Sequence, residues 1–90
     1  MTRQAIVAAN WKMNGDSALV DAMVSGMADV ELASNVDVVI CPSSPYLSAL
    51  SQKINSAKLN EAINVGSQNV NEHDSGAFTG EISTAMLKDL

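Results

Sequence analysis

Three short apolar runs alternate with helical patterns along the chain. The runs are Ala5–Ala9, Val36–Cys41 and Ile63–Gly66. None of them alternates cleanly between apolar and polar residues, which is typical of strands covered on both faces, as in parallel sheets. The pattern therefore predicts three buried parallel strands.

The segments between these runs have the period of amphipathic helices, with apolar residues at three- and four-residue steps. The first helix is expected over 19–30, with Asp16 or Ser17 as its N-cap. Ser44-Pro45 resembles an N-cap followed by proline at the first helical position, and Ser83 is expected to cap a third helix. The apolar positions that carry this period in the first helix are Leu19, Val20, Met23, Val24, Met27 and Val30, with Met23 and Met27 expected in the core. The expected buried stripe of the second helix is Leu47, Leu50 and Ile54.

The predicted order is β-α-β-α-β-loop-α, an α/β class. Strand starts near residues 5, 37 and 62 match crossover units of roughly 30 residues. Right-handed crossovers place all helices on one side if the strand order is 1-2-3, which leaves the other face bare. A closed barrel makes that face its interior, whereas a doubly wound sheet reverses its strand order. Periodicity alone leaves both architectures open.

Composition limits the function classes. Ninety residues with five basic and ten acidic side chains give one small domain of net charge −5, without the basic cluster of a nucleic-acid binder. The N-terminal apolar stretch is too short for a signal peptide or a membrane span. Cys41, the only cysteine, is expected to be buried and inert in a reducing compartment. His73, the only histidine, has no partner at metal spacing and is expected to lie at the surface.

Polar residues follow the first and third strands, at the sheet edge where α/β proteins bind ligands. Asn10 and Lys12 are two residues apart, so on an extended backbone their side chains point the same way. A lysine ammonium suits a phosphate or a developing oxyanion. The alternative is a solvated lysine in a surface turn. Gln68-Asn69 ends the third strand at the same edge, where a polar strand end is the simpler interpretation.

The segment Asn69–Glu81 has neither helical nor strand period, and a loop of this length is often functional. Gly76 and Gly80 flank Phe78, one of only three aromatic residues. An apolar loop tip is a candidate for contact with a partner protein. The alternative is that Phe78 folds back on its own core.

Three motifs together resemble the triosephosphate isomerase family. They are Ala9–Gly15 at the first strand end, Val65–Asn69 at the third, and Ser75–Ser83 in the loop, with Cys41-Pro42-Ser43 a looser match. The resemblance covers essentially the whole chain. It implies the first three βα units of a TIM (β/α)8 barrel, incomplete in this chain, so that residues 1–90 are the N-terminal portion of a single TIM-barrel domain.

The resemblance also implies an activity, a site and a partner. The family interconverts dihydroxyacetone phosphate and glyceraldehyde 3-phosphate through an enediolate, in glycolysis and gluconeogenesis, with no metal or organic cofactor. Asn10 and Lys12 would contact the triose phosphate, with Lys12 stabilising negative charge. The protein would be a cytoplasmic homodimer that docks through its 70–82 loop, and it would bind neither nucleic acid nor membrane. The interface residues would be Met13, Gln68, Phe78, Thr79 and Glu81, with Glu81 paired to an arginine beyond this chain.

The family's histidine electrophile and glutamate base follow the fourth and sixth strands, which this chain lacks. We therefore expect the isolated 90-residue chain to be inactive and poorly folded or self-associating, with its end inside a helix indicating truncation. The alternative class is a non-catalytic module that binds subunits through the 70–82 loop. The coding sequence after Leu90 distinguishes the two. A small flavodoxin-like domain is a weaker option that would need more strands.

Overall fold

The sheet is parallel, with three strands in the order β1-β2-β3. The computed structural model describes residues 3–90 and places the strands at Ala5–Asn10 (β1), Val36–Cys41 (β2) and Ile63–Val65 (β3). These bounds confirm the three predicted strands to within one residue at each end. The register pairs Ala9 with Ile40, and Ile40 with Val65, so all three strands end at one edge. This order excludes the 2-1-3 arrangement of flavodoxin-like sheets.

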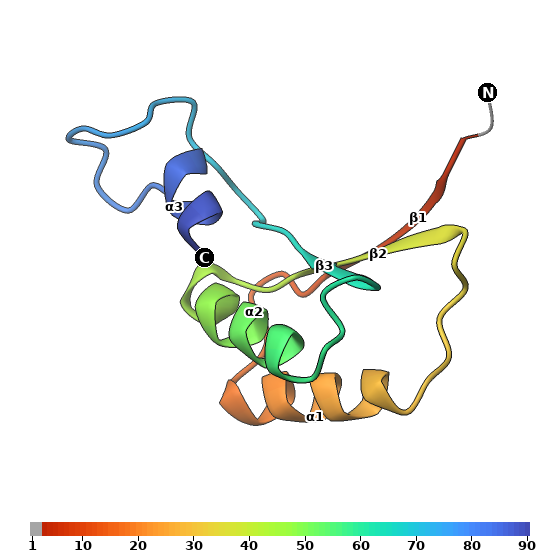
Figure 1. Cartoon of the computed structure of the whole chain (residues 1–90). Coiled ribbons are helices and arrows are strands. Elements are labelled where there is room, and N and C mark those ends of the chain that lie inside the picture. The colour runs from red at the N-terminus through yellow and green to blue at the C-terminus, as the bar shows by residue number, and fades with distance from the viewer. Residues whose placement is uncertain (1–2) are drawn as a thin grey trace.

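Two helices cover one face of the sheet, as right-handed crossovers require. They are α1 (Ser17–Ala28) and α2 (Leu47–Ser56), which lie together below the strands in Figure 1. The core forms where they meet the sheet, with Met23 and Met27 packed against it as predicted. Its buried members are Trp11, Val20, Val24, Ile40, Leu50, Ile54 and Ile63. An ion pair between Lys53 of α2 and Asp21 of α1 joins the two helices at the surface.

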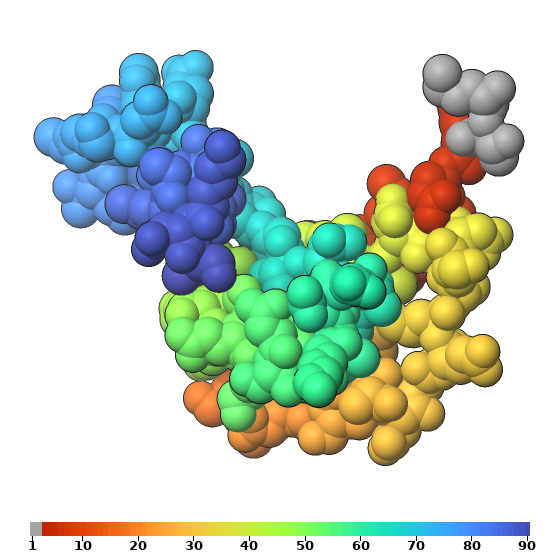
Figure 2. Space-filling view, in the orientation of Figure 1, coloured from red at the N-terminus to blue at the C-terminus, as the bar shows by residue number. Residues whose placement is uncertain are grey.

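The other face of the sheet is uncovered, as expected for the strand order 1-2-3 with its helices on one side. The expectation of strands buried on both faces is therefore not met within residues 3–90. Alternation along the paired strands puts Ile6, Val39 and Asn64 on that face. Ile6 is 64% exposed, and every residue of β1 is exposed. Figure 2 shows this side as a hollow between the red β1 and the blue C-terminal part. The strands have apolar residues on both faces, but within residues 3–90 only one face is covered. Such strands are typical of a sheet that packs a further layer of structure against its second face.

Side-chain caps start two of the helices, as predicted. Asp16 Oδ1 accepts a hydrogen bond of 2.8 Å from the Leu19 backbone N–H at the start of α1. Ser83 Oγ accepts one of 3.2 Å from Met86 and begins α3 (Thr84–Asp89). The first helix ends earlier than expected, because its last turn tightens into i→i+3 bonds. Val30 donates to the Met27 carbonyl at 3.3 Å and lies outside the helix, 56% exposed.

Ser44 does not cap the second helix, which corrects that prediction. A single 3₁₀ turn, η1 (Ser44–Tyr46), precedes α2 and makes no side-chain cap bond. The Tyr46 N–H donates to the Ser43 carbonyl at 3.0 Å, which closes an i→i+3 turn around Pro45. The proline thus starts the 3₁₀ turn, and α2 begins only at Leu47.

Candidate functional site

The end of β1 is anchored in the core by Trp11. Its N–H donates to the Cys41 carbonyl at 3.0 Å and continues the β1–β2 ladder by one residue. The side chain is 9% exposed and packs against Gly15. Gly15 has φ +112°, and a Cβ there would lie 3.0 Å from Trp11 Cε3. Trp11, to which the sequence alone assigned no role, thus fixes the position from which Lys12 extends.

Lys12 follows Trp11 with a left-handed backbone, at φ 55°. Its N–H donates to Asn10 Oδ1 at 2.9 Å, so the asparagine side chain folds over the turn. The prediction that Asn10 and Lys12 point the same way from an extended backbone is therefore wrong, because the extended geometry ends at Asn10. A non-glycine residue in this conformation costs on the order of 1 kcal/mol and persists where neighbours hold it. Contacts from neighbouring residues must therefore stabilise a backbone conformation that is unfavourable for lysine by itself.

Gln68 is the neighbour that holds this turn. Its Nε2 donates to the Lys12 carbonyl and to the Cys41 carbonyl, both at 2.9 Å. Asn14 Nδ2 adds a bond of 2.9 Å to the Trp11 carbonyl from the other side. One amide after β3 thus joins the ends of β1 and β2. Gln68 lies at the expected edge, but these contacts could not be predicted, because their partners lie 27 and 56 residues away in sequence.

The edge presents one cation to solvent. Lys12 and Asn10 are both exposed. Among residues 3–90 the ion pairs are Lys53–Asp21 and His73–Glu72, so no carboxylate neutralises the Lys12 ammonium there. Within the same residues, no three His, Cys, Asp or Glu side chains cluster as metal ligands do. An uncompensated ammonium at the carboxyl edge of a parallel sheet suits an anionic ligand.

Cys41 lies beside this site and is only half-buried, which corrects the expectation of full burial. It is the last residue of β2, where the bare face of the sheet leaves its side chain partly uncovered. Its Sγ would lie 3.0 Å from a Cβ at Gly66, so glycine is needed for the close approach of β3.

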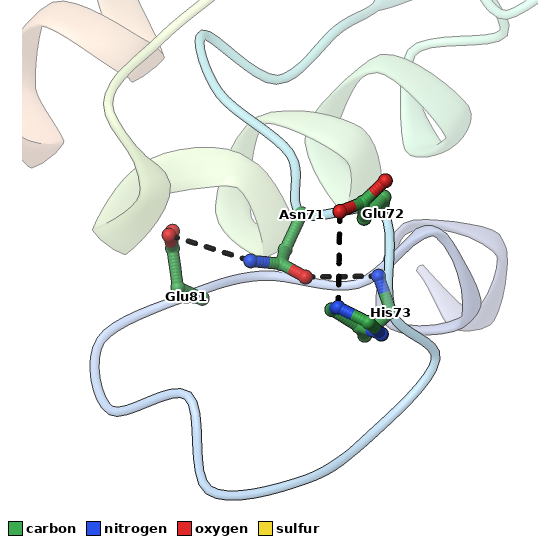
Figure 3. A network of polar contacts seen from close by, with 4 residues as sticks. All are labelled: Asn71, Glu72, His73 and Glu81. Atoms are coloured by element: carbon green, nitrogen blue, oxygen red, sulfur yellow. Dashed lines mark hydrogen bonds and ion pairs between the residues drawn. The ribbon is translucent and has the colours of Figure 1, made fainter.

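The 70–82 loop projects from the body of the molecule and is closed at its base (Figure 1). The Asn71 N–H donates to the Ile82 carbonyl at 2.7 Å, where the chain enters and leaves the loop. Asn71 Nδ2 also donates to Glu81 Oε1 at 3.4 Å, as Figure 3 shows. The loop is therefore an ordered unit with its own polar contacts.

Phe78 packs inside this loop and not on the sheet core. Its ring stacks on His73 with centroids 4.5 Å apart and planes 5° from parallel, and the residue stays 43% exposed. The alternative that Phe78 folds back on the core is therefore wrong, and its contact with a partner stays a prediction. His73 lies at the surface as expected, but it has a packing partner. The two rings line a hollow of about 240 Å³ that reaches Met86 of α3.

The other residues expected at a subunit interface lie on the surface. Met13 is 94% exposed, and Thr79 and Glu81 are exposed. Gln68 is exposed too, although its amide nitrogen is already bonded within the chain. Across residues 3–90, none of the helices has the length and apolar character needed to cross a bilayer.

Comparison with known proteins identifies the family that the chain resembles. The family model described as triosephosphate isomerase matches residues 5–90. A triosephosphate isomerase of Colwellia psychrerythraea is 80% identical over the whole chain, which covers 35% of that protein. Those of Alkalilimnicola ehrlichii and Shewanella frigidimarina are 43% and 44% identical over 98% and 97% of the chain, which covers 34% and 35% of them. The chain thus spans about a third of the length of these curated relatives.

Proposed function

Since the chain belongs to the triosephosphate isomerase family, we propose that the protein carrying it interconverts dihydroxyacetone phosphate and glyceraldehyde 3-phosphate. The reaction passes through an enediolate, and it serves glycolysis and gluconeogenesis in the cytoplasm. Residues 1–90 supply the N-terminal portion of a single barrel domain. The base and the electrophile that move the proton come from later strands, so the 90-residue chain alone is inactive.

The observation that carries this proposal is the held lysine at the end of β1. Lys12 has an unfavourable backbone conformation, and Gln68 bonds its carbonyl from another strand end. Rigid positioning of a charge is what electrostatic catalysis needs, because a group already in place requires no reorganisation as the transition state forms. A lysine that is only solvated at the surface needs no hydrogen bond from another strand end to its backbone carbonyl.

Within the proposed reaction, Lys12 and Asn10 bind and stabilise while other residues transfer the proton. The ammonium of Lys12 balances the phosphate dianion in the ground state. It also offsets negative charge that develops on the enediolate oxygen. Asn10 supports the turn through its Oδ1, which accepts from the Lys12 N–H. In the proposed complex its side chain would contact the triose phosphate. No metal or organic cofactor has a role in this scheme.

We also propose that the 70–82 loop makes a homodimer contact, together with the exposed Met13. The support is an ordered, projecting loop whose Phe78 remains 43% exposed. The interface would include Met13, Gln68, Phe78, Thr79 and Glu81. The same loop favours a second candidate function, in which a protein without isomerase activity binds subunits through it.

Isomerase assays on the full-length protein test the proposal. Lys12→Ala should lower kcat/KM by about 100-fold or more, the range seen when one charge-stabilising donor is removed. Lys53→Ala is the matched control, because Lys53 is a half-exposed cation on the helix layer and pairs with Asp21. Its activity should stay within twofold of the unmodified protein.

Two outcomes would contradict the proposal. Full activity in the Lys12→Ala protein, at both saturating and limiting substrate, would remove the role given to this side chain. A full-length protein that associates through the loop yet has no isomerase activity would support the second candidate instead.

A further inference from the structure

The peptide group that joins Trp11 to Lys12 is hydrogen-bonded at both of its polar ends. Its carbonyl accepts a bond of 2.9 Å from Asn14 Nδ2, and its N–H donates to Asn10 Oδ1, also at 2.9 Å. Both partners are side-chain amides, and neither bond belongs to a strand or helix ladder. The orientation of this peptide therefore depends on Asn10 and Asn14.

Rotation of this peptide plane would relieve the backbone of Lys12. Because a peptide group is planar, its carbonyl and its N–H turn together, and half a turn changes φ of the following residue by about 180°. Lys12 has φ 55°, so the rotated plane would place it in the extended region, which is favourable for lysine. The same rotation would break the bonds to Asn10 and Asn14. The two amides thus oppose a rotation that the lysine backbone favours.

Asn14 is well placed to oppose this rotation. Only its amide nitrogen can bond a carbonyl, since an amide oxygen accepts and does not donate. The bond is partly buried, so water competes with it less than with the exposed bond of Asn10. The next residue, Gly15, lies against the Trp11 ring, where an added Cβ would lie 3.0 Å from Cε3. The turn therefore folds back over Trp11 and brings the Asn14 amide to its carbonyl.

We propose that Asn14 is a positioning residue that keeps Lys12 in its left-handed conformation by locking the Trp11–Lys12 peptide. Its effect on catalysis rests on the proposed function, because the Lys12 ammonium is the group that it positions. Gln68 bonds the carbonyl of Lys12, which belongs to the next peptide, so that contact does not replace the one from Asn14. Loss of the Asn14 amide should therefore leave a mixture of left-handed and extended forms.

This mixture has a specific kinetic signature. A substrate that binds only the form with the ammonium in place has its apparent affinity reduced by the fraction of that form. In full-length Asn14→Ala, KM should rise about three- to tenfold, the range set by the cost of a left-handed lysine. At saturating substrate the competent form predominates, so kcat should stay within about twofold. A residue that only stabilised the fold would not separate KM from kcat in this way.

Two comparisons show whether the effect passes through Lys12. In a Lys12→Ala background, Asn14→Ala should leave KM unchanged, because there is no ammonium to misplace. Asn35→Ala is the matched control and should change neither KM nor kcat, since Asn35 is an exposed turn residue at the amino end of β2. If Lys12→Ala lowers activity as proposed, but Asn14→Ala leaves KM unchanged or raises it equally in both backgrounds, the inference is overturned.

The backbone of Lys12 can also be observed without reference to activity. The carbon chemical shifts of Cα and Cβ differ between left-handed and extended residues, so full-length protein with labelled lysine reports this conformation. The Lys12 shifts should move toward extended values in Asn14→Ala and stay in place in Asn35→Ala. Left-handed shifts that persist in Asn14→Ala would overturn the inference whatever the activity. Extended shifts in Asn14→Ala, together with full activity in Lys12→Ala, would support the lock and contradict only the proposed role of the ammonium.

Discussion

The amide of Gln68 offers the sharpest test of how the Lys12 turn is held. Gln68→Ala removes two hydrogen bonds of 2.9 Å, one to Lys12 and one to Cys41. Each such bond contributes about 0.5–1.5 kcal/mol net. Because Gln68 is exposed, water replaces part of this, and we expect a total loss of about 1 kcal/mol.

The loss should appear in catalysis as well as in stability. If the full amount reflects poorer placement of the Lys12 ammonium in the transition state, kcat/KM falls about fivefold. Gln68→Glu should do at least as much harm, since a carboxylate has no N–H to donate and faces two carbonyl oxygens. The assays are steady-state isomerase kinetics and denaturant unfolding of the full-length protein.

A matched control separates this effect from the general loss of a glutamine. Gln52 lies on α2 and is exposed, and its side chain bonds to Ser48 of its own helix at 3.5 Å. Gln52→Ala should leave kcat/KM unchanged. Normal kcat/KM and normal unfolding free energy in both Gln68→Ala and Gln68→Glu would refute the role given to Gln68. The turn at Lys12 would then be stable without the Gln68 amide.

Three backbone and surface changes give further tests by denaturant unfolding of the full-length protein. Gly15→Ala should destabilise by about 1–3 kcal/mol, since φ is +112° and the new Cβ would lie 3.0 Å from Trp11; an unchanged midpoint would show that the turn can relax. Lys58→Gly should stabilise by about 1 kcal/mol, because Lys58 has φ 60° after the end of α2, and any loss of stability would contradict this. Lys53→Met should change stability by less than about 1 kcal/mol, because the ion pair with Asp21 is half-exposed; a larger loss would mean that this pair holds the two helices together.

Local sequence signals predicted the elements of the fold well. Asp16 and Ser83 cap helices as expected, because an N-cap needs only a side-chain oxygen and an N–H three residues later. Ser44 failed as a cap, since the 3₁₀ turn around Pro45 satisfies the backbone without it. The strands were predicted from their apolar runs. What covers each face of the sheet was not predicted, because an apolar run carries no information about the neighbouring layer.

The roles of the predicted site residues stay predictions, but their geometry can be compared with the structure. Asn10 and Lys12 lie at the expected sheet edge, yet the left-handed turn at Lys12 was not predicted, because no glycine or asparagine at that position signals a positive φ. The contacts of Gln68 depend on three strand ends that meet only in the folded sheet. The stack of His73 on Phe78 depends on the path of the loop. The loop sequence has no helical or strand period from which that path could be predicted.

If Lys12 binds phosphate as proposed, its placement directly after Trp11 couples folding to ligand affinity. The indole is held among core side chains, and the very next residue carries the cation at the sheet edge. Any substitution that loosens the packing around Trp11 also loosens the base from which the ammonium extends. Repacking mutations chosen only for thermal tolerance would therefore alter phosphate affinity at a distance, without touching a single residue that meets the ligand.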